Sequence, residues 1–289
     1  MTIYTGVADV NGDFKVPFSS SYTGGQKITV TAEKDGAIKT IELYAPSEVV
    51  GGGSIQFGGS LENFPQNIGA MIFSSDVKSI SDYAFYSSGA GGNTFASSAT
   101  ALEFEAVEAI GEHAFYGFTS VQKIDFPDSL ISIGANAFQN CNSCTNVKMG
   151  GFIKSIGANA FAGCSEIVSV NIPDSVTSLG AYAFESCRSA IDIYIGTAIT
   201  SIPNNAFTYC SSLTSIIIPA NVQSLGSYAL GALSSLSSLS VKRGSPPTIT
   251  SDTLYELPST CKIYVPAASL SAYKAAANWK VHASKMIGI

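Results

Sequence analysis

Apolar residues recur along this chain at a fixed interval that organises most of the sequence. An Ala-Phe pair or a close variant returns repeatedly, and its second residue falls at Phe85, Phe115, Phe138, Phe161, Phe184, Phe207 and Leu230. The first step in this series is 30 residues, and each of the next five is 23. The excess in the first step coincides with a Gly-rich stretch at 87–94, which we interpret as a loop. A constant period of this length indicates a repeat architecture.

A second apolar pattern between these anchors predicts one short strand in each repeat. The fourth and sixth residues of each segment are apolar and alternate with polar ones, as in a strand. Pro or Gly often ends the segment. The phrase that follows, GANAF or similar, predicts a short helical or 3-10 turn, and Pro203 suits the first position of a helix. The segments are 121–127, 144–150, 167–173, 190–196, 213–219 and 236–242.

Three residues after each anchor, one slot accepts Phe, Cys or Leu, so we interpret it as a buried apolar position. Stacked coils could bring its cysteines within disulfide reach, but their even spacing favours packing. Cys144 and Cys261 fall at strand positions and are also assigned to the core. The predicted core ladder is Phe115, Phe138, Cys141, Phe161, Cys164, Phe184, Cys187, Phe207 and Cys210.

A single repeat has no core of its own, so the repeats must stack. Stacking gives one continuous core, with short parallel strands on one face and short helical or 3-10 turns on the other. The phrase L-x-x-I-x-I-P-x-x-V-x-x-I-G-x-x-A-F-x-x-C resembles the BspA-like leucine-rich repeats over residues 72–266. This resemblance implies a leucine-rich-repeat solenoid. Residues 267–289 resemble its C-terminal cap, with a helix over 268–277, Trp279 as a plug and a closing strand.

Residues 1–49 do not follow the repeat and predict a small all-β domain. Two extended segments joined by Asn11-Gly12 and two more joined by 34–36 are typical of hairpins. The pattern resembles the later strands of a bacterial Ig-like module. The earlier strands of such a module are absent, so either the domain is minimal or the chain begins inside a longer protein. Residues 50–71 would form a linker and an N-terminal shield for the solenoid.

Composition and charge narrow the classes of function. Hydrophobic residues make up 46% of the chain and charged residues only 12%, which predicts a packed protein with a Ser-, Thr- and Asn-rich surface. A net charge of −6 without a basic cluster argues against nucleic acid as a partner. No apolar run is long enough for membrane insertion, and the N-terminus has no secretory signal. We therefore expect a chain that is made without Sec export or that is a fragment of a longer protein.

Candidate catalytic and metal-binding groups are few, so we expect no enzyme, no cofactor and no metal. His113 stands where other repeats have Asn or Tyr and is interpreted as a structural residue of the turn, while His282 lies in the cap. The segment 9–13 could begin an EF-hand loop, but the twelfth position of that loop must be Glu. That position is residue 20, and the chain has Ser20 there. A local acidic cluster could act in acid–base chemistry but is better interpreted as a solvated face. It comprises Glu103, Glu105, Glu108 and Glu112.

The outward strand residues should form rows across the solenoid, because equivalent residues of adjacent coils are neighbours. Most are small and polar. Tyr194, Ile191 and Ile217 differ, and they are either contact anchors or ordinary strand formers. The candidate ligand-binding residues on this face are Asp125, Lys148, Asn171, Ile191, Asp192, Tyr194 and Ile217.

These features favour a non-enzymatic recognition or adhesion module that binds a protein or glycan ligand through the strand face. The BspA-like resemblance implies surface adhesion and partner binding, hence an extracellular or cell-surface location as a fragment of a longer secreted protein. The alternative is a virion-associated phage or prophage tail component that contributes to host-receptor binding. Such a component would need no signal peptide and would keep free cysteines. Self-association is a further open interpretation.

Overall fold

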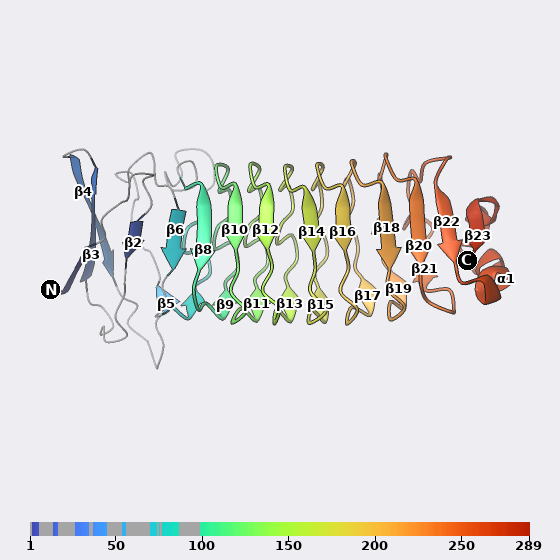
Figure 1. The fold of residues 1–289 in the computed structure, drawn as a ribbon, viewed down its shortest axis with the longest axis horizontal. Coiled ribbons are helices and arrows are strands. Elements are labelled where there is room, and N and C mark those ends of the chain that lie inside the picture. Colours follow the sequence, from blue (N-terminus) through green and yellow to red (C-terminus); the bar gives the residue numbers. More distant parts are fainter. Residues whose placement is uncertain are drawn as a thin grey trace.

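The computed structural model describes nearly all of the chain from residue 70 onward. Side chains are described for 70–73, 75, 77–86 and 99–289, and the main chain alone for the strands at 2–5, 14–16, 27–34, 37–44 and 54–55. From β6 onward the chain winds into coils that stack along one long axis (Figure 1). Two rows of parallel strands run along this stack.

The main strand row contains the strands predicted from the 23-residue pattern. In parallel pairs, Lys123 is opposite Asn146 and Asn171 is opposite Tyr194, so each residue faces its equivalent in the next repeat. The row comprises β6 (Ala70–Phe73), β8 (Ala101–Phe104), β10 (Lys123–Asp125), β12 (Asn146–Lys148), β14 (Ser169–Asn171), β16 (Asp192–Tyr194), β18 (Ser215–Ile218), β20 (Ser238–Val241) and β22 (Lys262–Val265).

A second row of two-residue strands, here called the short strand row, was not predicted as strand. Each member is a Ser-Ile pair or a variant of it, with the apolar residue at the position five before the anchor. The row comprises β5 (Ser54–Ile55), β7 (Ser79–Ile80), β9 (Ala109–Ile110), β11 (Ser132–Ile133), β13 (Ser155–Ile156), β15 (Ser178–Leu179), β17 (Ser201–Ile202), β19 (Ser224–Leu225) and β21 (Thr248–Ile249).

From β7 onward, the described segment after each short strand is a series of turns, not the predicted helical or 3-10 element. No helix forms between residues 99 and 266. The Gln139 N–H donates to the Asn136 carbonyl oxygen at 3.1 Å, but such bonds stay isolated. Asn136 and Asn140 have φ angles of 57° and 63°, and residues in this left-handed conformation prevent consecutive turns from joining into a helix. The side opposite the main strand row is therefore built from turns.

Two positions in these turns repeatedly adopt positive φ. The first, two residues before the anchor, has φ between 52° and 61° and includes His113, the predicted structural residue of the turn. Asn, His and Tyr occupy it, and Asn is among the residues that adopt this conformation most readily. The residues at this position are Tyr83, His113, Asn136, Asn159, Tyr182, Asn205 and Tyr228.

The core is a continuous column in which equivalent residues stack from coil to coil. The rings of Phe138 and Phe161 lie 5.4 Å apart and nearly parallel, and those of Phe161 and Phe184 lie 5.3 Å apart. Each thiol three residues after an anchor donates to the anchor carbonyl of the preceding coil, as Cys164 does to Phe138. All nine ladder residues are buried, and all six cysteines are buried free thiols.

The C-terminal segment covers the end of this column. Helix α1 (Leu270–Ala275) lies inside the predicted range 268–277, between the 3-10 helices η2 (Ala267–Ser269) and η3 (Lys280–Lys285). Trp279 is buried, and its indole N–H donates to the Pro247 carbonyl oxygen at 2.7 Å. Strand β23 (Met286–Gly288) closes the main row beside β22. The predicted plug and closing strand are therefore present.

Near the N-terminus, β3 (Lys27–Lys34) and β4 (Ala37–Tyr44) are antiparallel, as the second predicted hairpin requires. The turn of the first predicted hairpin lies outside the described residues, so that hairpin stays a prediction. β1 (Thr2–Thr5) pairs in parallel with β3, and β2 (Phe14–Val16) pairs in parallel with β6, because the edge of the main row offers β2 a ladder of hydrogen bonds. The Ig-like domain and the boundaries at residues 49, 71 and 266 stay predictions. Outside the described residues lie 9–13, 35–36 and 87–94.

Candidate ligand-binding site on the main strand face

The main strand row presents an outward face whose side chains alternate with core residues. In β16, Ile193 is buried, whereas Asp192 and Tyr194 are exposed. The parallel register aligns Asp125 with Lys148 and continues this line of outward side chains from coil to coil. The sequence therefore places the candidate ligand-binding residues on one face, and their role in binding stays a prediction.

A shallow hollow of about 340 Å³ lies on this face between β16 and β18. Tyr194 and Ile217 line it from the two strands, and their side chains are 45% and 54% exposed. Asp192 and Lys242 also line it, so the lining includes one acidic and one basic residue. The hollow thus offers an aromatic and an aliphatic contact beside both signs of charge.

Tyr194 is held in place by Asp174 of the preceding loop. The Tyr194 hydroxyl donates to Asp174 Oδ1 at 2.8 Å, and the same oxygen accepts from the Thr197 N–H at 2.8 Å and the Thr197 hydroxyl at 3.0 Å. These hydrogen bonds, that of the Thr197 N–H foremost, lower the pKa of the Asp174 carboxyl. The bond to Asp174 raises the pKa of Tyr194. The ring is therefore fixed at the hollow as a neutral phenol.

The predicted site residues divide into a group at the hollow and a group away from it. Asp192, Tyr194 and Ile217 line the hollow. Asn171 pairs directly with Tyr194, and the exposed Ile191 precedes Asp192. Asp125 and Lys148 lie on β10 and β12, nearer the N-terminal end of the row.

Asp125 belongs to a charged group that reaches across two strands. Lys123 Nζ lies 2.6 Å from an Asp125 carboxylate oxygen and 3.9 Å from one of Glu103. The hydrogen bond with Asp125 is the main cause that raises the pKa of Lys123. This part of the face is therefore charged and internally paired, whereas the hollow is apolar at its centre.

Sequence reasoning missed the hollow residues that lie just after the strands. Thr197, Pro219 and Lys242 belong to the segments that leave β16, β18 and β20. A signal existed at residue 242, because the repeats before it have Pro or Gly at that position and only this one has Lys. The departure of one repeat from its neighbours was the informative feature.

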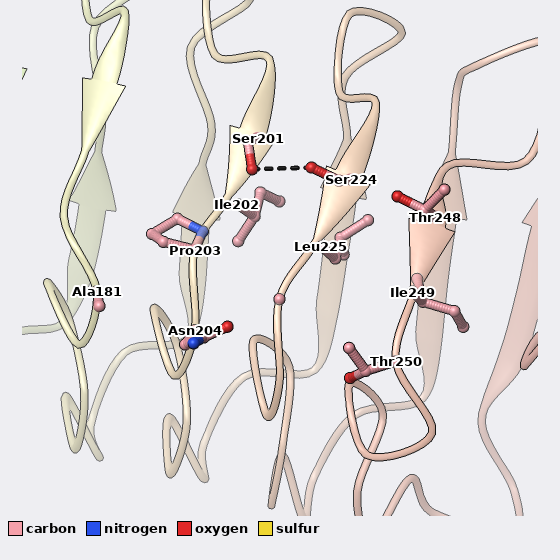
Figure 2. A pocket seen from close by; sticks show the side chains of 11 residues that line it. Ala181, Ser201, Ile202, Pro203, Asn204, Ser224, Leu225, Thr248, Ile249 and Thr250 are labelled. Atoms are coloured by element: carbon pink, nitrogen blue, oxygen red, sulfur yellow. Dashed lines mark hydrogen bonds between the residues drawn. The ribbon is translucent and has the colours of Figure 1, made fainter.

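A second hollow, of about 440 Å³, lies on the short strand side (Figure 2). Ile202 and Leu225 form part of its floor, and the hydroxyls of Ser201 and Ser224 are hydrogen-bonded at 2.9 Å. Pro203 stands at the margin nearest Ala181. Within the described chain, its lining contains neither a charged nor an aromatic residue, whereas the hollow between β16 and β18 has both.

The groups considered for catalysis do not converge. The His113 ring stacks on Tyr83 at 4.7 Å, with Nδ1 3.2 Å from a Glu112 carboxylate oxygen, so it takes part in a turn contact. Glu103 lies in β8, whereas Glu108 precedes β9 and Glu112 follows it. Within the described ranges, no three His, Cys, Asp or Glu side chains form a group that could hold a metal ion.

The described helices were also compared with what a membrane crossing requires. None of them has both the length and the apolar character needed to span a bilayer.

Comparison with solved structures supports the solenoid. The leucine-rich repeat protein of T. pallidum, TpLRR, is 23% identical over 63% of this chain and 82% of that chain, with a TM-score of 0.53. A leucine-rich repeat protein from Eubacterium ventriosum is 20% identical over 72% of this chain and 53% of that chain, with a TM-score of 0.49. The pneumococcal vaccine antigen PcpA is 15% identical over 92% of this chain and 98% of that chain, with a TM-score of 0.40. The similarity to TpLRR shows the fold.

Comparison with sequence families assigns the repeat itself. The chain has no match among curated proteins. The family described as the BspA type leucine-rich repeat region matches in six copies over residues 60–149, 90–187 and 142–256. These matches cover more than half of the chain and include the residues of the core ladder, which recur with a period of 23. The chain therefore belongs to the BspA type leucine-rich repeat family.

Proposed function

We propose that this chain is a non-enzymatic recognition module that binds a protein partner through the main strand face, at the hollow between β16 and β18. The observation that carries the proposal is the exposure of Tyr194 and Ile217 on the two sides of that hollow. Strands β16 and β18 each hold one of these apolar side chains in water, and covering them with a partner would be favourable.

The chemistry around the hollow favours a protein over a glycan. Ile191 and Val168 are exposed beside it, so the apolar contact continues along the face. Asp192 and Lys242 add charges of both signs at the margin. An apolar centre with a polar rim is the usual anatomy of a protein interface. A sugar would need more hydrogen-bonding groups at this centre.

The fixed position of Tyr194 supports the same function. Its hydroxyl is already bonded to Asp174 before any partner arrives, so little side-chain freedom remains to be lost on binding. Tyr is also among the residues that most often dominate the binding energy of an interface. Tyr194 is therefore the proposed main contact.

The proposed location is a cell surface. BspA-like repeats imply surface adhesion, and a charged content of only 12% with many Ser, Thr and Asn residues suits an exposed position. The phage-tail alternative, a glycan ligand and self-association stay predictions. Within the described residues, no feature favours them over a protein partner on a cell surface.

The test begins with a screen of the purified chain against an array of extracellular proteins and, in parallel, a glycan array. For a protein that binds, the double variant D192A/Y194A should weaken affinity by about 30-fold or more, as expected for loss of a dominant contact. Surface plasmon resonance gives the affinities.

The matched control is E166A/Y255A, which also removes one exposed carboxylate and one tyrosine. Tyr255 is 45% exposed, as Tyr194 is, and lies in a turn away from the main strand face. The control should bind as the unmodified chain does. Equal binding by D192A/Y194A, or binding only to glycans, would contradict the proposal.

A further inference from the structure

Both strand rows are interrupted at the same junction, between the coil of β15 and β16 and the coil of β17 and β18. The short row is hydrogen-bonded from β5 to β15 and again from β17 to β21, and the main row separates between β16 and β18. Figure 1 shows β16 and β18 farther apart than β14 and β16. Among the described coils from β7 onward, the junction of β12 with β14 interrupts only the main row.

The residue at the centre of this junction is Pro203. Glycine occupies the equivalent position in the neighbouring coils, and its N–H donates to the short strand before it. Gly180 donates to Ile156 at 2.8 Å, and Gly226 donates to Ile202 at 2.9 Å. Proline has no N–H, so Pro203 cannot make the corresponding bond to Leu179.

Proline is also too large for the normal spacing between coils. A Cβ atom at Gly157 would lie 2.5 Å from the Ala135 nitrogen, and one at Gly180 would lie 2.2 Å from the Ala158 nitrogen. The Pro203 ring projects toward the coil of Ala181 (Figure 2). The coil of Pro203 must therefore stand away from the one before it.

The core records the same separation, whereas the turns do not. The rings of Phe184 and Phe207 lie 6.0 Å apart, compared with 5.3 Å for Phe161 and Phe184. The turns stay joined, because the Ser186 N–H donates to the Thr208 carbonyl oxygen at 2.8 Å. The junction is thus held on its turn side, and both strand ladders are interrupted there, with the Asn221 side-chain amide donating to the Thr197 carbonyl oxygen beyond the end of β16.

We propose that Pro203 is a positioning residue for the binding site on the opposite, main strand face. By keeping the two coils apart, it prevents β18 from pairing with β16 as β16 pairs with β14. Tyr194 and Ile217 then line a hollow instead of standing as paired neighbours. The functional meaning of this inference rests on the proposed function, whereas its structural claim can be tested without a ligand.

The structural test is amide hydrogen exchange on the intact chain and on P203G. The Ile191 N–H is bonded to Val168, but within the described part of the chain the equivalent Thr214 N–H has no backbone partner. Thr214 should therefore exchange about tenfold or more faster than Ile191 in the unmodified chain. Glycine at 203 restores the donor and the space, so P203G should slow Thr214 to the level of Ile191.

The control is P266G, which makes the same substitution before η2 and should leave Thr214 unchanged. Unchanged exchange at Thr214 in P203G, or slowing by P266G as well, would overturn the proposal. A partner found in the array screen adds a second readout, because P203G should lose affinity by about tenfold as the hollow closes. Full affinity of P203G together with slowed exchange at Thr214 would also overturn the positioning role. A screen that finds no protein partner would count only against the proposed function.

Discussion

The Cys164 thiol donates a hydrogen bond to the Phe138 carbonyl oxygen, 3.2 Å away in the preceding coil. The same bond recurs between Cys210 and Phe184 at 3.3 Å. A thiol is small and apolar enough for the core and still supplies a weak donor. This explains why cysteine recurs in a slot that Phe118 and Leu233 fill elsewhere.

We expect the six thiols to be inert while the chain is folded. All six are buried, and burial raises the pKa of Cys210 to about 12, so reactive thiolate is scarce at neutral pH. A chromogenic thiol reagent should label none of them within minutes at pH 7.5 and all of them in denaturant. Rapid labelling of Cys164 without denaturant would contradict the ladder.

Stability should fall as the pH rises above 9. The unfolded thiol of Cys210 ionises near its ordinary pKa of 9.0, whereas the folded thiol keeps its proton until about 12. Its contribution is therefore complete below pH 9 and is lost as the pH rises toward 12. Between pH 8 and pH 10 the loss from this thiol is about 1 kcal/mol.

The variant C210A isolates this effect, since alanine cannot ionise. Urea unfolding at pH 8 and pH 10 should show a smaller loss of stability for C210A than for the unmodified chain. All other groups titrate alike in the two proteins and cancel in the difference. Identical pH dependence would show that burial does not retain the proton.

Removing one ring from the phenylalanine column should be costly. Phe161 is stacked on both sides, against Phe138 and Phe184, so F161A should lower the free energy of unfolding by about 3–5 kcal/mol. Leu230 occupies the equivalent slot in a later coil, so F161L should cost only about 1.5 kcal/mol. Urea denaturation measures both costs. A smaller cost for F161A than for F161L would contradict the stacked phenylalanine column.

The positive-φ position of the turn should reject a branched side chain. Asn159 has a φ of 54°, so N159G should be neutral or stabilising, whereas N159V should cost about 1–2 kcal/mol. The exposed Gln223 provides a control for the added valine, and Q223V should change stability little. Thermal unfolding compares the three variants, and equal effects of N159G and N159V would exclude the backbone explanation.

The sequence was most informative wherever a pattern repeats. The spacing from Phe115 to Leu230 predicted the coil length, the main strands and the burial of the cysteines, because each coil must present the same apolar set to its neighbours. These features follow from period and hydrophobicity. The cap, with Trp279 as its plug, was expected from the resemblance to the C-terminal end of BspA-like repeat proteins.

Features that depend on backbone conformation or on a broken pattern were not predicted. The turns were expected to be helical, because φ at Asn136 cannot be inferred from hydrophobic spacing. The pairing of β2 with β6 depends on a free strand edge far along the chain, which a local sequence pattern does not reveal. Pro203 was assigned to a helix start, although its effect lies in the missing donor and the bulk of its ring.

The register of one repeat per coil has a mechanical consequence. Lys123 faces Asn146 and Ser132 faces Ser155, so the bonds between coils join residues about one repeat apart. A force applied to the two ends of the solenoid would act on the coils in series. Each coil would extend by its 23 residues when it unfolds. Under such a force we expect the junction at Pro203, where both strand ladders are interrupted, to separate first.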